Sequence, residues 1–271
     1  MKELIIAFGL FLFIEGILYA LFPSKMKSML LKLNDVTNSQ LRTGGLIFAL
    51  IGFLIALHWL AFFKAVKVSN VSITLAMMST GAFFTSLLEP IFFKRKIIKY
   101  EVVFGLIVIV GLYIIFKVET AYLTGILFAL LSSFLGALFS IFNGMVVKTY
   151  DATIISFYEL FFGVVFITIF IFSTDGFNVS FFDLSSTDWI YILLLASVCT
   201  AYAFIAAVHI MKWISPYTLM LTTNMEPVYG IILALLILGD KEYMNPTFYL
   251  GALIILMTVI VNGIIKTRKK V

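Results

Sequence analysis

The sequence has few of the residues on which soluble enzymes and secreted domains depend. Its 271 residues include one cysteine and two histidines, and only 12% of them are charged. Cys199 has no partner for a disulfide within the chain, and two distant histidines do not supply the ligand cluster of a metal site. The sequence also contains no His-Glu-x-x-His motif, no Gly-rich phosphate loop and no Ser/His/Asp order. We therefore expect no enzymatic activity, no catalytic residues, no bound metal and no cofactor.

Apolar residues take the place of the missing charge. Hydrophobic residues make up 62% of the chain, whereas roughly 45–50% is typical of soluble proteins. A soluble domain of this size could not bury so much apolar surface in one core, but lipid can cover it. The formal net charge is +5, and basic residues spread among apolar segments fit cytoplasmic loops better than nucleic-acid binding. The composition predicts a membrane protein that contacts the lipid bilayer and no nucleic acid.

A run of about 20 apolar residues spans the hydrocarbon of a bilayer, and nine segments of the chain meet this criterion. They lie near residues 4–22, 43–63, 70–92, 101–117, 121–146, 153–173, 188–209, 216–238 and 247–265. Residues 23–42 are expected to form a short amphipathic helix on the membrane surface. The prediction is an all-α polytopic membrane protein with about nine transmembrane helices.

Basic residues are distributed unequally between the two sides of this predicted bundle. Of the 19 lysines and arginines, fourteen lie on the side reached after the odd-numbered helices and five lie on the other. Cytoplasmic loops are enriched in basic residues, so the side with fourteen is predicted to face the cytoplasm. The C-terminal tail is then cytoplasmic, and the N-terminus and the polar loop 174–187 are outside.

The sequence also contains a weak internal repeat. A shift of 146 residues aligns 53–117 with 199–263 without a gap and pairs Leu75 with Leu221. The segment 121–146 has no partner, because its match would lie before the start of the chain. Each repeat would contain five helices, an odd number, so the two repeats would cross the membrane in opposite directions. This predicts inverted five-helix repeats with the first helix of the first repeat missing, an architecture common among secondary transporters, although all polytopic chains share some hydropathy rhythm.

The repeat gives the expected domain organisation. An incomplete first repeat covers 1–117 and includes an atypical N-terminal segment, 1–56. The second repeat covers 121–265, and 266–271 form a basic cytoplasmic tail.

Several stretches resemble the EamA-like members of the drug/metabolite transporter superfamily, and together they fall between about residue 50 and residue 265. These stretches are 57–72, 79–84, 156–160, 226–230 and 238–242. The resemblance implies ten helices in two inverted five-helix repeats, with substrates held in a central cavity. It also implies export of amino acids, other metabolites or drugs.

The N-terminal segment departs from that family. Residues 1–56 resemble a small, uncharacterised two-helix bacterial membrane protein family, through 14–23 and 40–42. We therefore expect a bacterial inner (plasma) membrane protein and keep two functions open. The first is a secondary transporter, an exporter of small-molecule substrates by alternating access with proton coupling. The second is a non-transporting membrane protein, either an assembly partner or an inactive fusion or truncation. A homodimer is left open for both.

Four acidic residues lie within predicted spans, and no lysine or arginine lies equally deep. They are Glu15, Glu89, Glu159 and Glu226. A carboxyl group in low-dielectric surroundings is neutral unless water, substrate or a cation reaches it, which is the physical basis of a proton-coupled site. Glu89 lies close to the basic cluster 94–96 and is expected to pair with it at the interface.

Glu226 is the preferred candidate. It follows Pro216 by ten residues, about 15 Å along a helix and near the bilayer midplane. It precedes Pro227, which removes a helical hydrogen bond where binding sites of transporters form. The alternative role is a hydrogen bond between packed helices.

The other expected site residues surround Glu226 or lie at a similar depth. The predicted substrate- and proton-binding set is Glu226, Asn224, Glu159, Tyr158, Ser79 and Thr80. The spans 43–63, 70–92, 153–173, 188–209 and 216–238 are expected to form the cavity walls. His58 and Trp59 are expected near the outer membrane interface, where Trp is common.

Overall fold

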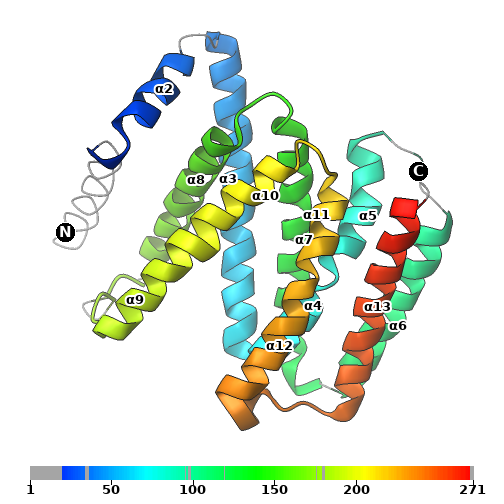
Figure 1. Cartoon of the computed structure of the whole chain (residues 1–271). Coiled ribbons are helices and arrows are strands. Elements are labelled where there is room, and N and C mark those ends of the chain that lie inside the picture. The colour runs from blue at the N-terminus through cyan, green and yellow to red at the C-terminus, as the bar shows by residue number, and fades with distance from the viewer. Residues whose placement is uncertain are drawn as a thin grey trace.

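The structure is a computed structural model that describes residues 20–33, 37–94, 96, 99–118, 120–174, 176–178 and 181–268. All regular secondary structure within these residues is helical (Figure 1). The predicted all-α fold is confirmed. Glu15 lies outside the described residues.

Most of the helices follow one another with short connections, and a longer loop joins α8 to α9. Their bounds are α2 (Pro23–Leu33), α3 (Asn38–Val68), α4 (Val71–Met78), α5 (Gly81–Phe92), α6 (Lys99–Val118), α7 (Leu123–Val146), α8 (Ala152–Ser173), α9 (Ser186–Leu194), α10 (Ala203–Ile210), α11 (Pro216–Thr223), α12 (Met225–Leu238) and α13 (Pro246–Arg268). A π-helical segment, η2 (Leu195–Tyr202), joins α9 to α10, and short 3-10 turns, η1 (Thr120–Tyr122) and η3 (Gly239–Glu242), precede α7 and follow α12.

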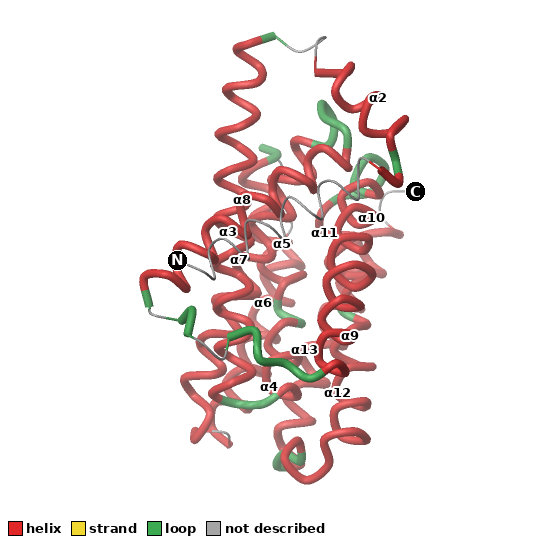
Figure 2. The backbone as a smooth tube through the Cα atoms, turned by 90° about the vertical axis from the view of Figure 1, so that its left-hand side faces the viewer, coloured by secondary structure: helices red, strands yellow, loops and turns green. Residues whose placement is uncertain are grey.

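The described residues contain 7 helical segments that are long and apolar enough to cross a membrane. They are Arg42–Val68, Val71–Phe92, Thr120–Val146, Ala152–Ser173, Ser186–Ile210, Pro216–Leu238 and Pro246–Ile265. A shorter apolar helix, Val103–Ile115, lies within α6. These segments coincide with eight of the nine predicted spans, while residues 4–19 of the first span, 4–22, lie outside the described residues. Most of the helices run along one common direction, with their loops towards the two ends (Figure 2). The protein is an all-α polytopic membrane protein.

Two spans that were expected to be continuous are broken in the middle. The first changes from α4 to α5 at Ser79 and Thr80, where the Thr80 hydroxyl donates to the Met77 carbonyl at 2.7 Å and so competes with the helical backbone. The second changes from α11 to α12 at Asn224. Pro227 has no N–H for the carbonyl four residues earlier, and the break places this proline in the first turn of α12, where that loss is harmless.

The two broken helices are equivalent elements of an inverted pair. Asn70 caps the N-terminus of α4 and Ser215 caps that of α11, 145 residues later. The helix breaks at Ser79 and Asn224 are also 145 residues apart. The structural register therefore differs by one residue from the predicted shift of 146. In Figure 1 the α4–α5 pair and the α11–α12 pair run in opposite directions.

The next helix of each half, α6 in one and α13 in the other, shows the same reciprocity. These two helices pack closely against each other (Figure 1). A Cβ atom added to Gly111 would lie 3.0 Å from the carbonyl oxygen of Gly251, and one added to Gly251 would lie 3.0 Å from that of Gly111. The helices meet backbone to backbone through small residues, as is usual in membranes.

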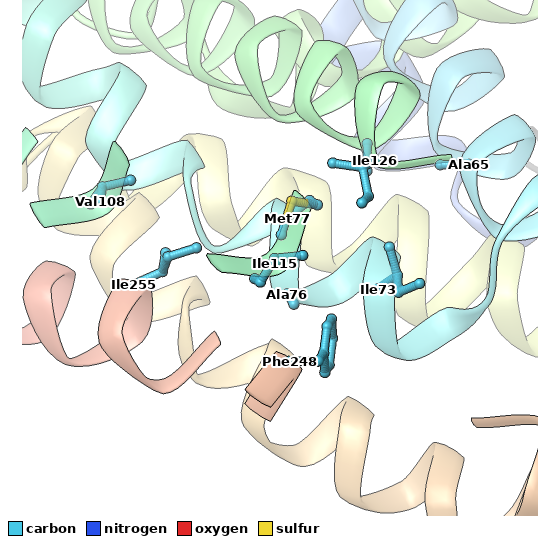
Figure 3. Close-up of a cluster of buried hydrophobic side chains, with 10 residues drawn as sticks. Ala65, Ile73, Ala76, Met77, Val108, Ile115, Ile126, Phe248 and Ile255 are labelled. Carbon is cyan, nitrogen blue, oxygen red and sulfur yellow. The ribbon is translucent and has the colours of Figure 1, made fainter. Parts of the chain in front are cut away.

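An apolar core fixes α4 between its neighbours. Side chains from α3, α4, α6, α7 and α13 meet in this cluster (Figure 3). Its fully buried members include Ile73, Ile115, Ile126, Phe248 and Ile255. The cluster therefore holds α4, the first half of the first broken helix, against α3, α6, α7 and α13.

Candidate functional site

A cavity of about 560 Å³ lies between the two broken helices and their neighbours, a volume within the range of small-molecule sites. Its lining residues are His58, Trp59, Phe62 and Phe63 of α3; Leu75 and Met78 of α4; Gly81 of α5; Leu160 and Val164 of α8; Ile192 of α9; Leu195, Ala196, Thr200 and Ala201 of η2; Met220 and Thr223 of α11; Asn224; and Glu226 of α12. Each of the five spans expected to form walls contributes to this lining.

The lining follows the inverted repeat. Leu75 and Met220 both line the cavity and lie 145 residues apart, the spacing of the helix breaks. Met78 and Thr223 form a second such pair. The two halves therefore surround the cavity with equivalent positions of α4 and α11.

Gly81 and Glu226 form a third pair with the same spacing, but they differ in chemistry. The first repeat contributes no side chain at this position, and the second contributes a carboxyl group. The two halves therefore differ in chemistry at this position. Glu226 is the single acidic residue among the described lining residues of the cavity.

Glu226 lies in the first turn of α12 and near the middle of the span Pro216–Leu238. The N-terminus of a helix carries partial positive charge that stabilises a negative group. The described lining residues include no lysine or arginine. A proton or a bound cation is therefore what can neutralise the Glu226 carboxylate.

Asn224 lies beside Glu226 at the helix break, and its side chain is buried. Its Nδ2 has no hydrogen-bond partner among the described residues. A buried amide without a partner is costly in an apolar interior. Asn224 therefore places an unpartnered buried amide donor next to the cavity that it helps to line.

His58 and Trp59 were expected near the membrane interface, and this prediction is wrong. The helix α3 continues to Val68 rather than ending near residue 63, so His58 lies about 15 Å from its C-terminal end. Both residues line the cavity. His58 Nδ1 lies 2.8 Å from the Ser132 carbonyl oxygen and donates to it, and the Ser132 hydroxyl donates back to the His58 carbonyl at 3.0 Å. These bonds fix the imidazole against α7.

Three other predicted site residues, Ser79, Thr80 and Tyr158, do not line the cavity. Ser79 and Thr80 donate their hydroxyls to the Leu75 and Met77 carbonyls at the helix break. Tyr158 lies parallel to Phe48, with ring centroids 6.0 Å apart. The structure therefore brings Glu226 and Asn224 to the cavity, and it does not bring these three residues there.

Glu159 belongs to a separate buried polar group between α3, α7 and α8. Its side chain is fully buried, and neither carboxylate oxygen has a hydrogen-bond partner among the described residues. The Asn143 side chain of α7 lies near it, and the Ser156 hydroxyl one turn earlier is also unpartnered. This group is a second place where a proton could be held, apart from the cavity.

The sequence model of the EamA-like transporter family matches residues 123–264, which is just over half of the chain and spans α7 to α13. The chain belongs to the EamA-like transporter family. The N-terminal segment of this EamA-like protein matches a different family, described as an uncharacterised protein conserved in bacteria (DUF2065), over residues 4–60. Both resemblances predicted from the sequence are confirmed. The EamA-like family consists of transporters rather than enzymes, so the protein is a member of a membrane-transporter family.

Comparison of structures supports the fold of this EamA-like protein. A solved structure titled "Crystal structure of protein" is similar with a TM-score of 0.55 over 84% of this chain and 88% of that chain. The two share 13% sequence identity, so the likeness concerns the fold alone. No curated protein is similar enough in sequence to count as a relative.

Proposed function

We propose that this protein is a secondary transporter that exports small organic solutes, such as amino acids, metabolites or drugs, by alternating access. The observation that carries the proposal is a cavity of about 560 Å³ framed by two oppositely directed broken helices. Discontinuous helices around a site in the middle of the membrane are the usual construction of substrate sites in secondary transporters.

The cavity chemistry favours solutes with an apolar body and a positive charge. His58, Trp59, Phe62 and Phe63 supply aromatic surface, and Glu226 supplies the carboxyl group. Aromatic faces and a carboxylate both attract organic cations. Anionic solutes find no lysine or arginine among the described lining residues.

A single carboxylate also provides a means of coupling. The carboxylate charge can be neutralised by a bound proton or by a neighbouring cationic solute. Once one of them is bound, the other is no longer required. A proton that arrives from outside would therefore displace the solute, and a solute that arrives from the cytoplasm would displace the proton. Exchange of one for the other produces export driven by the proton gradient.

The proposed setting is the inner membrane of a bacterium, with the N-terminus outside and the C-terminus in the cytoplasm. Support comes from the fourteen basic residues on one side. Lys148 on that side donates to the carbonyls of Met211 and Lys212, which ties the α7–α8 turn to the α10–α11 turn. Lipid is the surrounding partner, and a homodimer is compatible with the proposed cycle.

One observation favours the second function, a non-transporting membrane protein. Residues 4–60 match the DUF2065 family, whereas the match to the EamA-like transporter family covers only residues 123–264.

Transport by purified protein in liposomes separates the two functions. The probes are tetraphenylphosphonium, an apolar organic cation, and a set of radiolabelled amino acids, under an imposed pH gradient. We expect movement of the cation that stops when nigericin collapses the gradient. Folded protein that moves no probe faster than empty liposomes would favour the non-transporting function.

A further inference from the structure

The two broken helices are tied together at the predicted outer side of the membrane by Glu242. This residue ends η3, directly after α12, and its side chain is buried. Its Oε1 accepts from the Val71 N–H at 3.2 Å, and its Oε2 accepts from the Ser72 N–H at 2.8 Å. The end of α12 thus binds the N-terminus of α4.

A second carboxylate forms the corresponding bond at the predicted inner side. Glu89 lies near the end of α5 and is buried, and its Oε2 accepts from the Tyr217 N–H at 3.1 Å. Pro216, the first residue of α11, has no N–H, so Tyr217 is the first position of this helix that can donate. The end of α5 thus binds the N-terminus of α11.

The two bonds occupy equivalent places in the inverted repeat. Ser72 is the second residue after the cap Asn70, and Tyr217 is the second residue after the cap Ser215. In each case a carboxylate at the end of one broken helix holds the N-terminus of the other. The pairs lie at opposite ends of the molecule, where α4 packs against α12 and α11 packs against α5 (Figure 1).

Both tethered half-helices reach the cavity. α4 carries the lining residues Leu75 and Met78, and α11 carries Met220 and Thr223. A change at the N-terminus of either half-helix therefore affects the end of the cavity that this half-helix lines. Hydrogen bonds to a carboxylate are stronger than neutral ones, so each tether is a strong contact between the two broken helices.

We propose that Glu242 and Glu89 are positioning residues that close the outer and the inner end of the cavity, respectively. Loss of the Glu242 contact opens the cavity to the outside only, and loss of the Glu89 contact opens it to the cytoplasm only. This inference rests on the proposed transport function, because it assigns to each carboxylate one half of the alternating-access cycle.

Side-specific labelling of a cavity cysteine tests the inference. Cys199 is exposed, so Cys199→Ser provides the background, and Thr223→Cys provides the reporter in the cavity. A membrane-impermeant maleimide is added to intact cells and, separately, to inside-out vesicles. We expect Glu242→Ala, which removes both hydrogen bonds to Val71 and Ser72, to raise the labelling rate from outside at least about tenfold and to leave the rate from inside unchanged. Glu89→Ala should give the reverse.

The matched control is Asp151→Ala. Asp151 also binds a helix N-terminus, accepting from the Thr153 N–H at 2.9 Å, but its bond is local to α8. This variant should change labelling from neither side. If an alanine variant does not fold, Glu242→Gln or Glu89→Gln replaces it in the test. Each glutamine variant should raise the labelling rate from the same side as its alanine counterpart, by a smaller factor. Folded variants that label equally from both sides, or like the background protein, would overturn the inference. Labelling needs no solute, so this result is independent of failed transport in liposomes.

Discussion

Glu226 and His58 show what a sequence reveals about single residues of a transporter. Glu226 is detectable because a carboxyl group inside an apolar span is rare and costly. The position predicted for His58 was wrong because the apolar run 43–63 is shorter than α3, which ends at Val68. The hydrogen bond between Ser72 and Glu242 joins residues 170 positions apart. No local sequence pattern predicts such a contact.

Close packing at Gly52 gives a prediction at the same scale. A Cβ atom at this position would lie 2.6 Å from Phe162 Cβ and 2.7 Å from the Glu159 carbonyl oxygen. Gly52→Ala should therefore force α3 and α8 apart and destabilise the protein by about 1–3 kcal/mol. Gly45→Ala in the same helix has nothing within 4 Å and should stabilise the helix by about 0.5–1 kcal/mol. Thermal unfolding in detergent compares the two, and equal melting temperatures would contradict the packing described here.

The positions of whole helices were easier to predict than their internal breaks. Hydropathy located eight spans because a membrane imposes both length and composition on them. The breaks at Ser79 and Asn224 depend on hydroxyl groups and a proline that redirect individual backbone hydrogen bonds. Pro227 indicated weakness near Glu226, but it did not show that the helix would end three residues earlier.

The cap of α4 provides the prediction for this scale. The Asn70 side chain accepts from the Ile73 N–H at 2.9 Å, in a buried position. Asn70→Ala should lower the free energy of unfolding by about 1–2 kcal/mol, because a buried N–H loses its acceptor. Asn70→Ser keeps a capping oxygen and should recover most of that loss. Equal melting temperatures for the two variants would show that the cap contributes nothing.

The all-α polytopic fold and the opposite directions of the two broken helices could be predicted from the sequence. A weak internal match and an odd number of helices predicted that equivalent helices run in opposite directions, as α4–α5 and α11–α12 do. The predicted shift erred by one residue because few identities anchor it. The domain bounds 1–117 and 121–265 stay predictions. The cavity itself arises from side chains of seven elements, and sequence order alone does not define its shape.

Membrane orientation is the prediction for the whole chain. A reporter that is active only in the periplasm should be active when inserted after residue 177, in the polar loop that follows α8. The same reporter should be silent at the C-terminus, next to the basic tail. The opposite result at both sites would reverse the topology and exchange the sides assigned to Glu242 and Glu89.

The central claim is that the carboxyl group of Glu226 exchanges a proton for a solute. Glu226→Gln keeps the shape and a polar head group but cannot bind or release a proton. The decisive measurement is tetraphenylphosphonium transport in liposomes for both proteins, driven by a pH gradient and, separately, by a solute gradient alone. We expect the variant to fold normally and to lose the movement driven by the pH gradient. A Glu226→Gln protein that transports the cation as fast as the original under a pH gradient would contradict the claim and leave Glu159 as the candidate.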